Sequence, residues 1–237
     1  MRYGARMPLT RTVRVLAVGA LALLAGCGST APAPSADGAA PSAAPDAAAL
    51  RAAALTDADL GPGWTVTLMN PGQGDPAAPG EKADRPACQP ILDAVSPGAS
   101  GSGPLAEVDL DIAQADDGRR SVYAGLLAFR AGRAERIRAE LDRLLTVCTA
   151  FHSAAAGGPT TTHRLQRIDT PTPEGADAVT AFTLTNESEG TALVQRALMA
   201  RTGEVLAVFT TVGSPKEPTP EPDRQVVRAQ LARLTHH

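Results

Sequence analysis

Two histidines and a serine lie close together in the chain and could do chemistry: His152, Ser153 and His163. A serine nucleophile beside a histidine base is the central part of a serine hydrolase. Such a site also needs a third group that orients the histidine, and the α/β-hydrolases present their serine on a Gly-x-Ser-x-Gly turn. Ser153 lacks this turn, and no acid is placed to orient either histidine. We therefore interpret His152 as the end of a helix and His163 as a strand-surface residue, and we expect no catalytic residues.

Three acidic residues form a second candidate cluster. Glu107, Asp109 and Asp111 alternate with apolar residues, so they share one face of a predicted strand. They could act as paired carboxylates or as a calcium platform, but calcium takes about six to eight oxygens, usually from one compact loop. No Asp-x-Asp-x-Asp-Gly loop is present, and we interpret these residues as a solvated strand face. The chain also lacks a phosphate-binding loop, a cofactor fingerprint and a Cys-x-x-Cys motif, so we expect no metal and no cofactor.

The only tryptophan, Trp64, directly follows Gly61-Pro62-Gly63. A tryptophan in this position could line a ligand cleft, although a lone tryptophan at the start of a strand is more typical of a core anchor. Trp64 is the one candidate for a ligand contact that the sequence offers.

The N-terminal segment has the order of a secretory signal peptide, because arginines precede the apolar run Val15–Leu24 and small residues follow it. The run is about ten residues long, too short for a permanent transmembrane helix. Leu24-Ala25-Gly26-Cys27 resembles the lipobox that the prolipoprotein acylating enzyme and lipoprotein signal peptidase recognise. The resemblance implies that residues 1–26 are removed and that Cys27 carries a diacylglyceryl thioether. A plain secretory signal with a chance cysteine is the alternative.

Residues 27–46 are predicted to be the lipidated cysteine and a disordered tether. Alanine, proline, serine and glycine dominate this segment, without an apolar periodicity that could bury a core. A flexible coil of this length spans on the order of 25 Å. Two or three acyl chains hold a protein on a bilayer, so we expect a lipid anchor on the extracytoplasmic face of the cell membrane.

The charge of the processed chain argues against one class of partner. Removal of residues 1–26 takes four of the 22 basic side chains and none of the 25 acidic ones, which leaves 18 against 25, a net charge of −7. A mildly acidic chain without a basic patch is not typical of a nucleic-acid-binding protein, and we expect no nucleic-acid partner.

Residues 47–237 are predicted to form a single α+β domain. Consecutive strands joined by short turns favour an antiparallel meander, so we expect a twisted antiparallel sheet of about six to seven strands with helices packed mainly on one face. The predicted strands are Trp64–Leu68, Leu105–Ala113, Ser121–Phe129, Thr161–Ile168, Ala178–Asn186, Ala192–Ala200 and Val205–Val212. The predicted helices are an Ala-rich stretch ending at Leu55, a short turn capped by Thr56 and Asp59, Cys88–Val95, Arg133–Phe151, and a last helix with Val227, Leu231 and Leu234 on one face.

Cys88 and Cys148 are the cysteines that remain beside the lipidated one. An exported domain lies in an oxidising compartment, so a disulfide bond is the default expectation. Closing a loop of about 60 residues is worth on the order of 4 kcal/mol in the chain-entropy model. Two unpaired buried thiols or a metal site are the alternatives, although two cysteines fall short of the four ligands of a structural zinc.

Short motifs along the domain resemble a known family. They are Leu55-Thr56-Asp57-Ala58-Asp59-Leu60-Gly61-Pro62-Gly63-Trp64, Cys88 before a short helix, and Cys148-Thr149-Ala150-Phe151. The chain resembles actinobacterial lipoproteins related to the extracellular sensor domain of PknH-type serine/threonine kinases. This resemblance implies a twisted antiparallel sheet flanked by helices, with a cleft for an unknown ligand. The kinase domains use two disulfides and this chain has cysteines for one; no ligand-contacting residue carries over.

These observations favour a non-catalytic, membrane-anchored lipoprotein of the cell envelope. Its domain would bind a small molecule, a cell-wall component or a protein partner, as a sensor or accessory subunit. One alternative is an envelope enzyme whose active site is not visible as a motif, and the other is a purely structural envelope protein.

Overall fold

The computed structural model describes residues 44–70, 80–95, 103–115, 121–213, 216 and 218–236. The predicted signal peptide, Cys27 and the predicted tether up to residue 43 lie outside these residues. Within the described part of the chain, no helix is long and apolar enough to cross a membrane.

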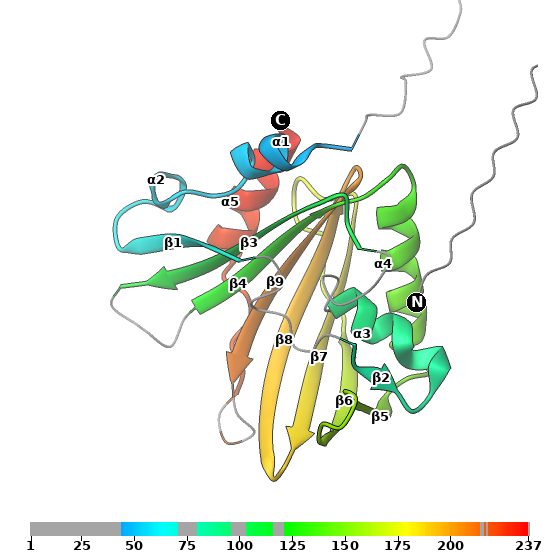
Figure 1. Ribbon diagram of the computed structural model, residues 1–237. Helices are drawn as coiled ribbons and strands as arrows, with labels where there is room; N and C mark the ends of the chain where they lie inside the picture. Colours follow the sequence, from blue (N-terminus) through cyan, green and yellow to red (C-terminus); the bar gives the residue numbers. More distant parts are fainter. Residues whose placement is uncertain are drawn as a thin grey trace, which may run out of the picture. The chain divides into compact units, whose positions relative to one another are not determined.

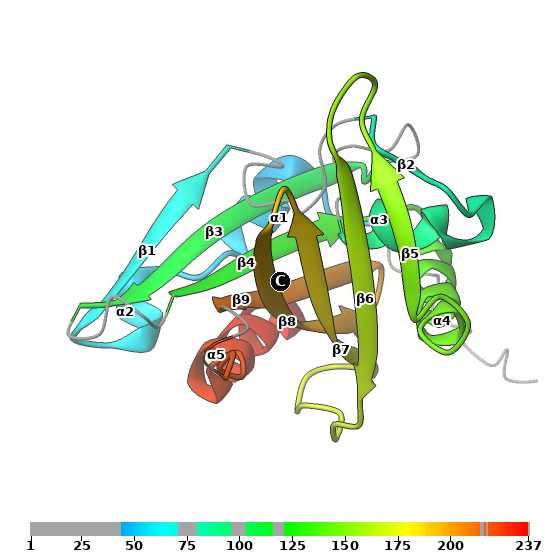
Figure 2. The ribbon, with the colours of Figure 1, turned by 90° about the horizontal axis from the view of Figure 1, so that it is seen from below.

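A nine-stranded sheet, antiparallel throughout, forms the centre of the fold (Figure 1). The strand order is β1-β3-β4-β9-β8-β7-β6-β5-β2, so β6 to β9 form the predicted meander, and β5 extends it. Figure 2 shows how strongly the strand directions rotate from β1 to β6. The strands are β1 (Trp64–Met69), β2 (Lys82–Ala83), β3 (Ala106–Gln114), β4 (Ser121–Ala128), β5 (Ala150–Ala154), β6 (Thr160–Ile168), β7 (Ala178–Ser188), β8 (Thr191–Thr202) and β9 (Val205–Gly213).

The prediction of six to seven strands is wrong because β2 and β5 were missed. The predicted helix Arg133–Phe151 is shorter in the structure, where α4 (Arg133–Leu144) ends and a turn leads into β5. The Thr146 hydroxyl donates to the Arg143 carbonyl at the helix end, and the next residues alternate between exposed and buried, as a strand requires. β5 pairs with β6, and this pairing supplies the backbone hydrogen bonds that a longer α4 would have made.

Helices cover both faces of the sheet, not mainly one face as predicted. Successive residues of β9 point to opposite faces, and they belong to two different apolar cores. Val205, Ala207 and Phe209 pack with α1 (Ala47–Ala52), α2 (Asp57–Leu60) and α5 (Arg224–Thr235). Leu206 packs in the other core, with α3 (Gln89–Val95) and α4. We call these the α5 face and the α4 face.

A disulfide bond between Cys88 and Cys148 lies in the core of the α4 face, which confirms the predicted pairing. Cys88 ends a short 3₁₀ helix, Pro86–Cys88, and Cys148 lies in the turn after α4. The bond therefore fixes the end of α4, and with it the start of β5, against the segment that precedes α3.

Candidate functional site

A cleft of about 550 Å³ opens on the α5 face between the loop after β6 and the start of α5. Both lie on the same side of the sheet (Figure 2). Residues 168–174 form one wall, and residues 221–228, which include the first turn of α5, form the other. The volume falls within the range of roughly 300–1,000 Å³ typical of small-molecule sites.

The floor of the cleft is apolar. Ala181 on β7 and Leu198 on β8 are direct partners across the two strands and both line the floor. Ile168 closes one side and Val227 of α5 the other. A ligand in the cleft would thus place an apolar part against the sheet.

The rim of the cleft is charged, with basic and acidic side chains on different walls. Arg196, Arg224 and Arg228 lie on β8 and α5, whereas Asp169 and Glu174 lie on the loop after β6. Glu221 stands on the basic side.

Hydrogen bonds anchor both walls. On the α5 side, the Thr211 hydroxyl donates to the Pro220 carbonyl and holds the segment before α5 against β9. On the loop side, the Thr202 hydroxyl donates to the Gly175 carbonyl at 2.9 Å. Gly175 has a positive φ of 84° and lies so close to Leu231 that a Cβ atom would stand 3.3 Å from the Leu231 Cβ. The walls are thus formed before any ligand arrives.

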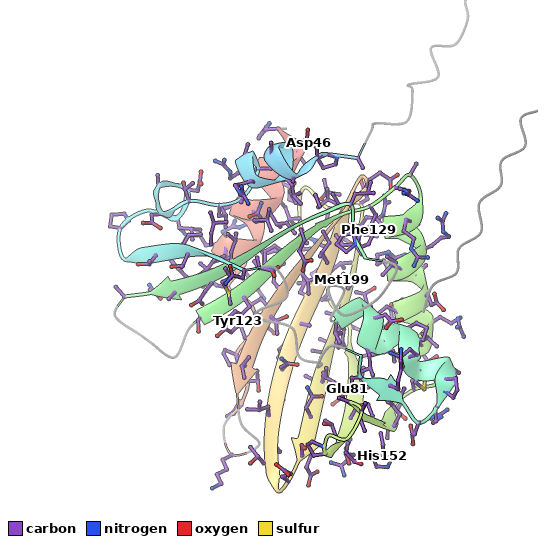
Figure 3. The ribbon with its side chains drawn as sticks, viewed as in Figure 1. Asp46, Glu81, Tyr123, Phe129, His152 and Met199 are labelled. Carbon is purple, nitrogen blue, oxygen red and sulfur yellow. A yellow bond between two sulfur atoms is a disulfide. The ribbon has the colours of Figure 1, made fainter. Side chains whose placement is uncertain are left out.

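The second candidate site is a buried polar cluster on the α4 face. The Ser153 hydroxyl contacts both the Glu81 carboxylate and Nε2 of His163. Nδ1 of His163 lies 2.8 Å from Oδ1 of Asn186, and the imidazole stacks on Phe151 with ring centroids 4.7 Å apart. Glu81 lies beside β2 and β5 at one end of the sheet (Figure 3).

This cluster has the order nucleophile, base and orienting group, but its serine is closed off. Ser153 is 3% exposed and His163 1%. Glu81 occupies the space beside the hydroxyl, with its carboxylate also 3.6 Å from His163 Nε2. The cleft on the α5 face does not reach Ser153 or His163. The arrangement holds β5, β6 and β7 together as a buried hydrogen-bonded network.

Two members of this cluster, Glu81 and Asn186, were not predicted from the sequence. Asn186 meets His163 because the two residues are direct partners across β6 and β7. Because these two predicted strands follow each other in the chain, their pairing was foreseeable, but the contact was predictable only with a known register. Glu81 arrives from the segment before α3, and no local pattern marks it.

The predicted positions of the two histidines are wrong in different ways. His152 lies on β5 and is exposed, with Nδ1 3.2 Å from the Thr162 hydroxyl, because the helix ends earlier than predicted. His163 does lie on a strand, β6, but it is buried instead of on the surface.

The other predicted candidates lie elsewhere. Glu107, Asp109 and Asp111 share a half-buried face of β3, where the first two line a small cavity of about 60 Å³ near Tyr123. Among the described residues, no group of three or more histidine, cysteine or acidic side chains is arranged to hold a metal ion. Trp64 packs at the border of the α5-face core and lines neither cavity.

Comparisons with known proteins give distant structural likeness alone. No model of a protein family matches the chain, and no curated protein matches its sequence. The solved structure of an uncharacterised protein from Mycobacterium smegmatis, the Rv0999 ortholog, is 12% identical. The match covers 78% of this chain and 95% of that one, with a TM-score of 0.42. A likeness this distant carries no functional assignment.

Proposed function

We propose that this protein is a lipid-anchored, extracytoplasmic binding protein that takes a small ligand into the cleft on the α5 face, as a sensor or accessory subunit of the cell envelope. The observation that carries the proposal is the cleft itself, which has the volume of a small-molecule site, an apolar floor and anchored walls. The lipobox at Cys27 and the tether that follows it support the proposed localisation, a lipid anchor on the extracytoplasmic face of the membrane. A relationship to PknH-type sensor domains belongs to the same proposal, and the motif Leu55–Trp64 and the Cys88–Cys148 disulfide support it.

The arrangement of polar groups favours binding over catalysis. The cleft is lined by arginines, carboxylates, threonines and prolines, whereas the Ser153–His163 pair lies on the other face of the sheet. The cleft and the pair therefore do not combine into one active site.

The first experiment is native mass spectrometry of the Cys27→Ser protein, exported from a related host and purified gently. A bound molecule of defined mass is expected. Leu198→Trp fills the floor of the cleft and should remove that adduct. Leu193→Trp is the matched control, because Leu193 lies on the same strand but is 49% exposed and does not line the cleft. An adduct that survives Leu198→Trp, or a wild-type protein that binds nothing from an envelope extract, would overturn the proposal for this cleft.

The address is tested separately by metabolic labelling with a palmitate analogue. The wild-type protein should incorporate the label and remain with the membrane fraction, and Cys27→Ser should do neither. Label retained by Cys27→Ser would show that the cysteine is not the acylated residue.

The order of groups in the Ser153 cluster favours one alternative, an envelope hydrolase. A fluorophosphonate reagent decides between the two functions, because it phosphonylates, with loss of fluoride, only an activated and accessible serine. We expect no labelling of the folded protein. Labelling that disappears in Ser153→Ala would favour the hydrolase.

A further inference from the structure

On the basis of the proposed function, we infer that the cleft recognises an organic anion, with an apolar body on the floor and a carboxylate or phosphate group on Arg196. Glu221 occupies the place of that anionic group when the cleft is empty.

Arg196 is held at the edge of the apolar floor with its guanidinium directed to the α5 side. Its side chain is only 27% exposed, and Nη2 lies 2.6 Å from Oε1 of Glu221. Among the described residues, this is the only ion pair of Arg196. A guanidinium offers five donors in a planar fork that matches carboxylate and phosphate oxygens. The contact with Glu221 uses one nitrogen, so the fork can take a second oxygen.

The backbone at Glu221 is anchored, but the Glu221 carboxylate is only weakly bound to Arg196. The segment that carries it is fixed by the hydrogen bond from Thr211 to the adjacent Pro220. Its side chain is 55% exposed, and exposed ion pairs contribute little to stability because water and salt screen them. A ligand that also buries an apolar body can therefore displace the Glu221 carboxylate. The existing pair shows that this position accepts a carboxylate.

Two further arginines make this wall positive after Glu221 is counted. Arg224 and Arg228 lie four residues apart, on one side of α5, and both line the cleft. Arg224 approaches Glu221 only to 3.9 Å. The side chains that line this wall thus include three guanidinium groups and one carboxylate, and an added anion would reduce the repulsion among the guanidinium groups.

The acidic wall sets the orientation of the ligand. Glu174 lies on the loop across the cleft, and Asp169 lies on the same loop, 3.8 Å from Arg167, which also pairs with Asp142 of α4 on the other face. Like charges disfavour an anion on that side. The anionic group therefore points to Arg196, and the apolar body lies along Leu198 and Ala181.

Three probes with the same ten-carbon chain test the inference: decanoate, decyl phosphate and decan-1-ol, each below its aggregation concentration. Binding is measured by isothermal titration calorimetry on the Cys27→Ser protein, with one of the two anions expected to bind about tenfold or more tightly than the alcohol. Arg196→Gln should remove this advantage and leave decan-1-ol unchanged. Glu221→Gln should strengthen anion binding several-fold, because it removes the internal competitor.

The matched control is Arg164→Gln. Arg164 also forms an ion pair with a glutamate of the neighbouring strand, Glu187, with Nη1 3.0 Å from Oε2. Arg164 lies outside the cleft. This variant should bind every probe as the wild type does. Which anion binds more tightly identifies the head group as a carboxylate or a phosphate.

The outcomes separate this inference from the proposed function. If decan-1-ol binds as tightly as both anions and Leu198→Trp abolishes binding, the cleft is a binding site but the anion inference is wrong. If Arg196→Gln weakens the binding of all three probes equally, Arg196 maintains the shape of the cleft but does not bind the anionic group. This result also overturns the inference. If no probe binds and native mass spectrometry finds no adduct, both proposals fail.

Discussion

Nδ1 of His163 lies 2.8 Å from Oδ1 of Asn186, and the two residues are direct partners across β6 and β7. Because an amide oxygen only accepts, the Nδ1–H group donates this hydrogen bond. The other ring nitrogen then faces the Ser153 hydroxyl, which in turn contacts Glu81. The register of β6 and β7 thus fixes the orientation of the His163 imidazole. The contact of this imidazole with Ser153 in turn holds the end of β5 in place.

Ser153→Ala should destabilise the protein by about 1–3 kcal/mol, since it leaves a buried carboxylate and a buried imidazole nitrogen without their shared partner. Guanidinium denaturation followed by circular dichroism measures the change. Ser188→Ala is the control, because the Ser188 hydroxyl makes only a 3.5 Å contact with the Thr160 carbonyl near the surface. Equal stability of the two variants would show that the cluster is not a structural network.

The Cys88–Cys148 disulfide closes a loop with a sequence separation of 60 residues. Replacing both cysteines by alanine should lower the free energy of unfolding by about 4 kcal/mol, chiefly because the unfolded chain gains freedom. In the unfolded but unreduced protein, a thiol reagent should label neither cysteine. Labelling at both positions would contradict the bond.

Gln230 connects α5 to the end of α1 and is fully buried. Its Oε1 accepts from the Leu55 backbone N–H at 3.0 Å, and its Nε2 donates to the Ala53 carbonyl at 2.8 Å. Gln230→Leu has a similar size but leaves both backbone groups without partners, so we expect a loss of about 2–4 kcal/mol. The fluorescence of Trp64, the only tryptophan, reports unfolding of this core.

Gln225→Leu is the matched variant for Gln230. Gln225 also donates to a backbone carbonyl, that of Leu60 at 2.8 Å, but it is exposed and water can replace the bond. Gln225→Leu should lower the free energy of unfolding by about 1 kcal/mol or less. If the two variants unfold at the same denaturant concentration, burial does not decide the cost.

The sequence predicted those parts of the fold that depend on local alternation. Ala106, Val108, Leu110 and Ile112 are buried in β3 as their spacing indicates. β5 was missed because Leu141, Leu144, Leu145, Cys148 and Phe151 keep a helical spacing and all become buried, although only the first two lie within α4. The burial of these residues was predicted correctly. Pairing with β6 and the Cys88–Cys148 disulfide determine that the backbone after α4 is a turn and a strand and not a helix.

The candidate sites were less predictable because they depend on contacts distant in sequence. The cleft joins a Pro-rich loop after β6 to a helix some fifty residues later, and neither segment has a motif of its own. In the sequence, Arg196 resembles any polar residue on a strand; its place at the edge of the cleft, beside Glu221, makes it a candidate ligand contact. Long-range packing produces this information, and local patterns do not carry it.

Asp59 links the short helix α2 to α5, and this link should be sensitive to acid. Arg233 Nη1 lies 3.0 Å from Oδ1 of Asp59, and the Thr56 backbone and hydroxyl both donate to Oδ2 at 2.7 Å. Burial alone would raise the pKa of the Asp59 carboxyl. The hydrogen bonds from Thr56 and the charge of Arg233 outweigh it and hold the pKa below its ordinary value of 3.8.

A folded-state pKa below the unfolded one means that ionised Asp59 stabilises the fold above about pH 4, and that this contribution is lost as the pH falls through the folded-state pKa. Asp59→Asn should therefore be less stable than the wild type near neutral pH and should lose less stability on acidification to about pH 3. Asp169→Asn, which alters a fully exposed carboxylate, should follow the wild-type profile. Urea denaturation across this range tests the prediction. If the Asp59→Asn and wild-type curves stay parallel, the Asp59–Arg233 contact does not link stability to pH.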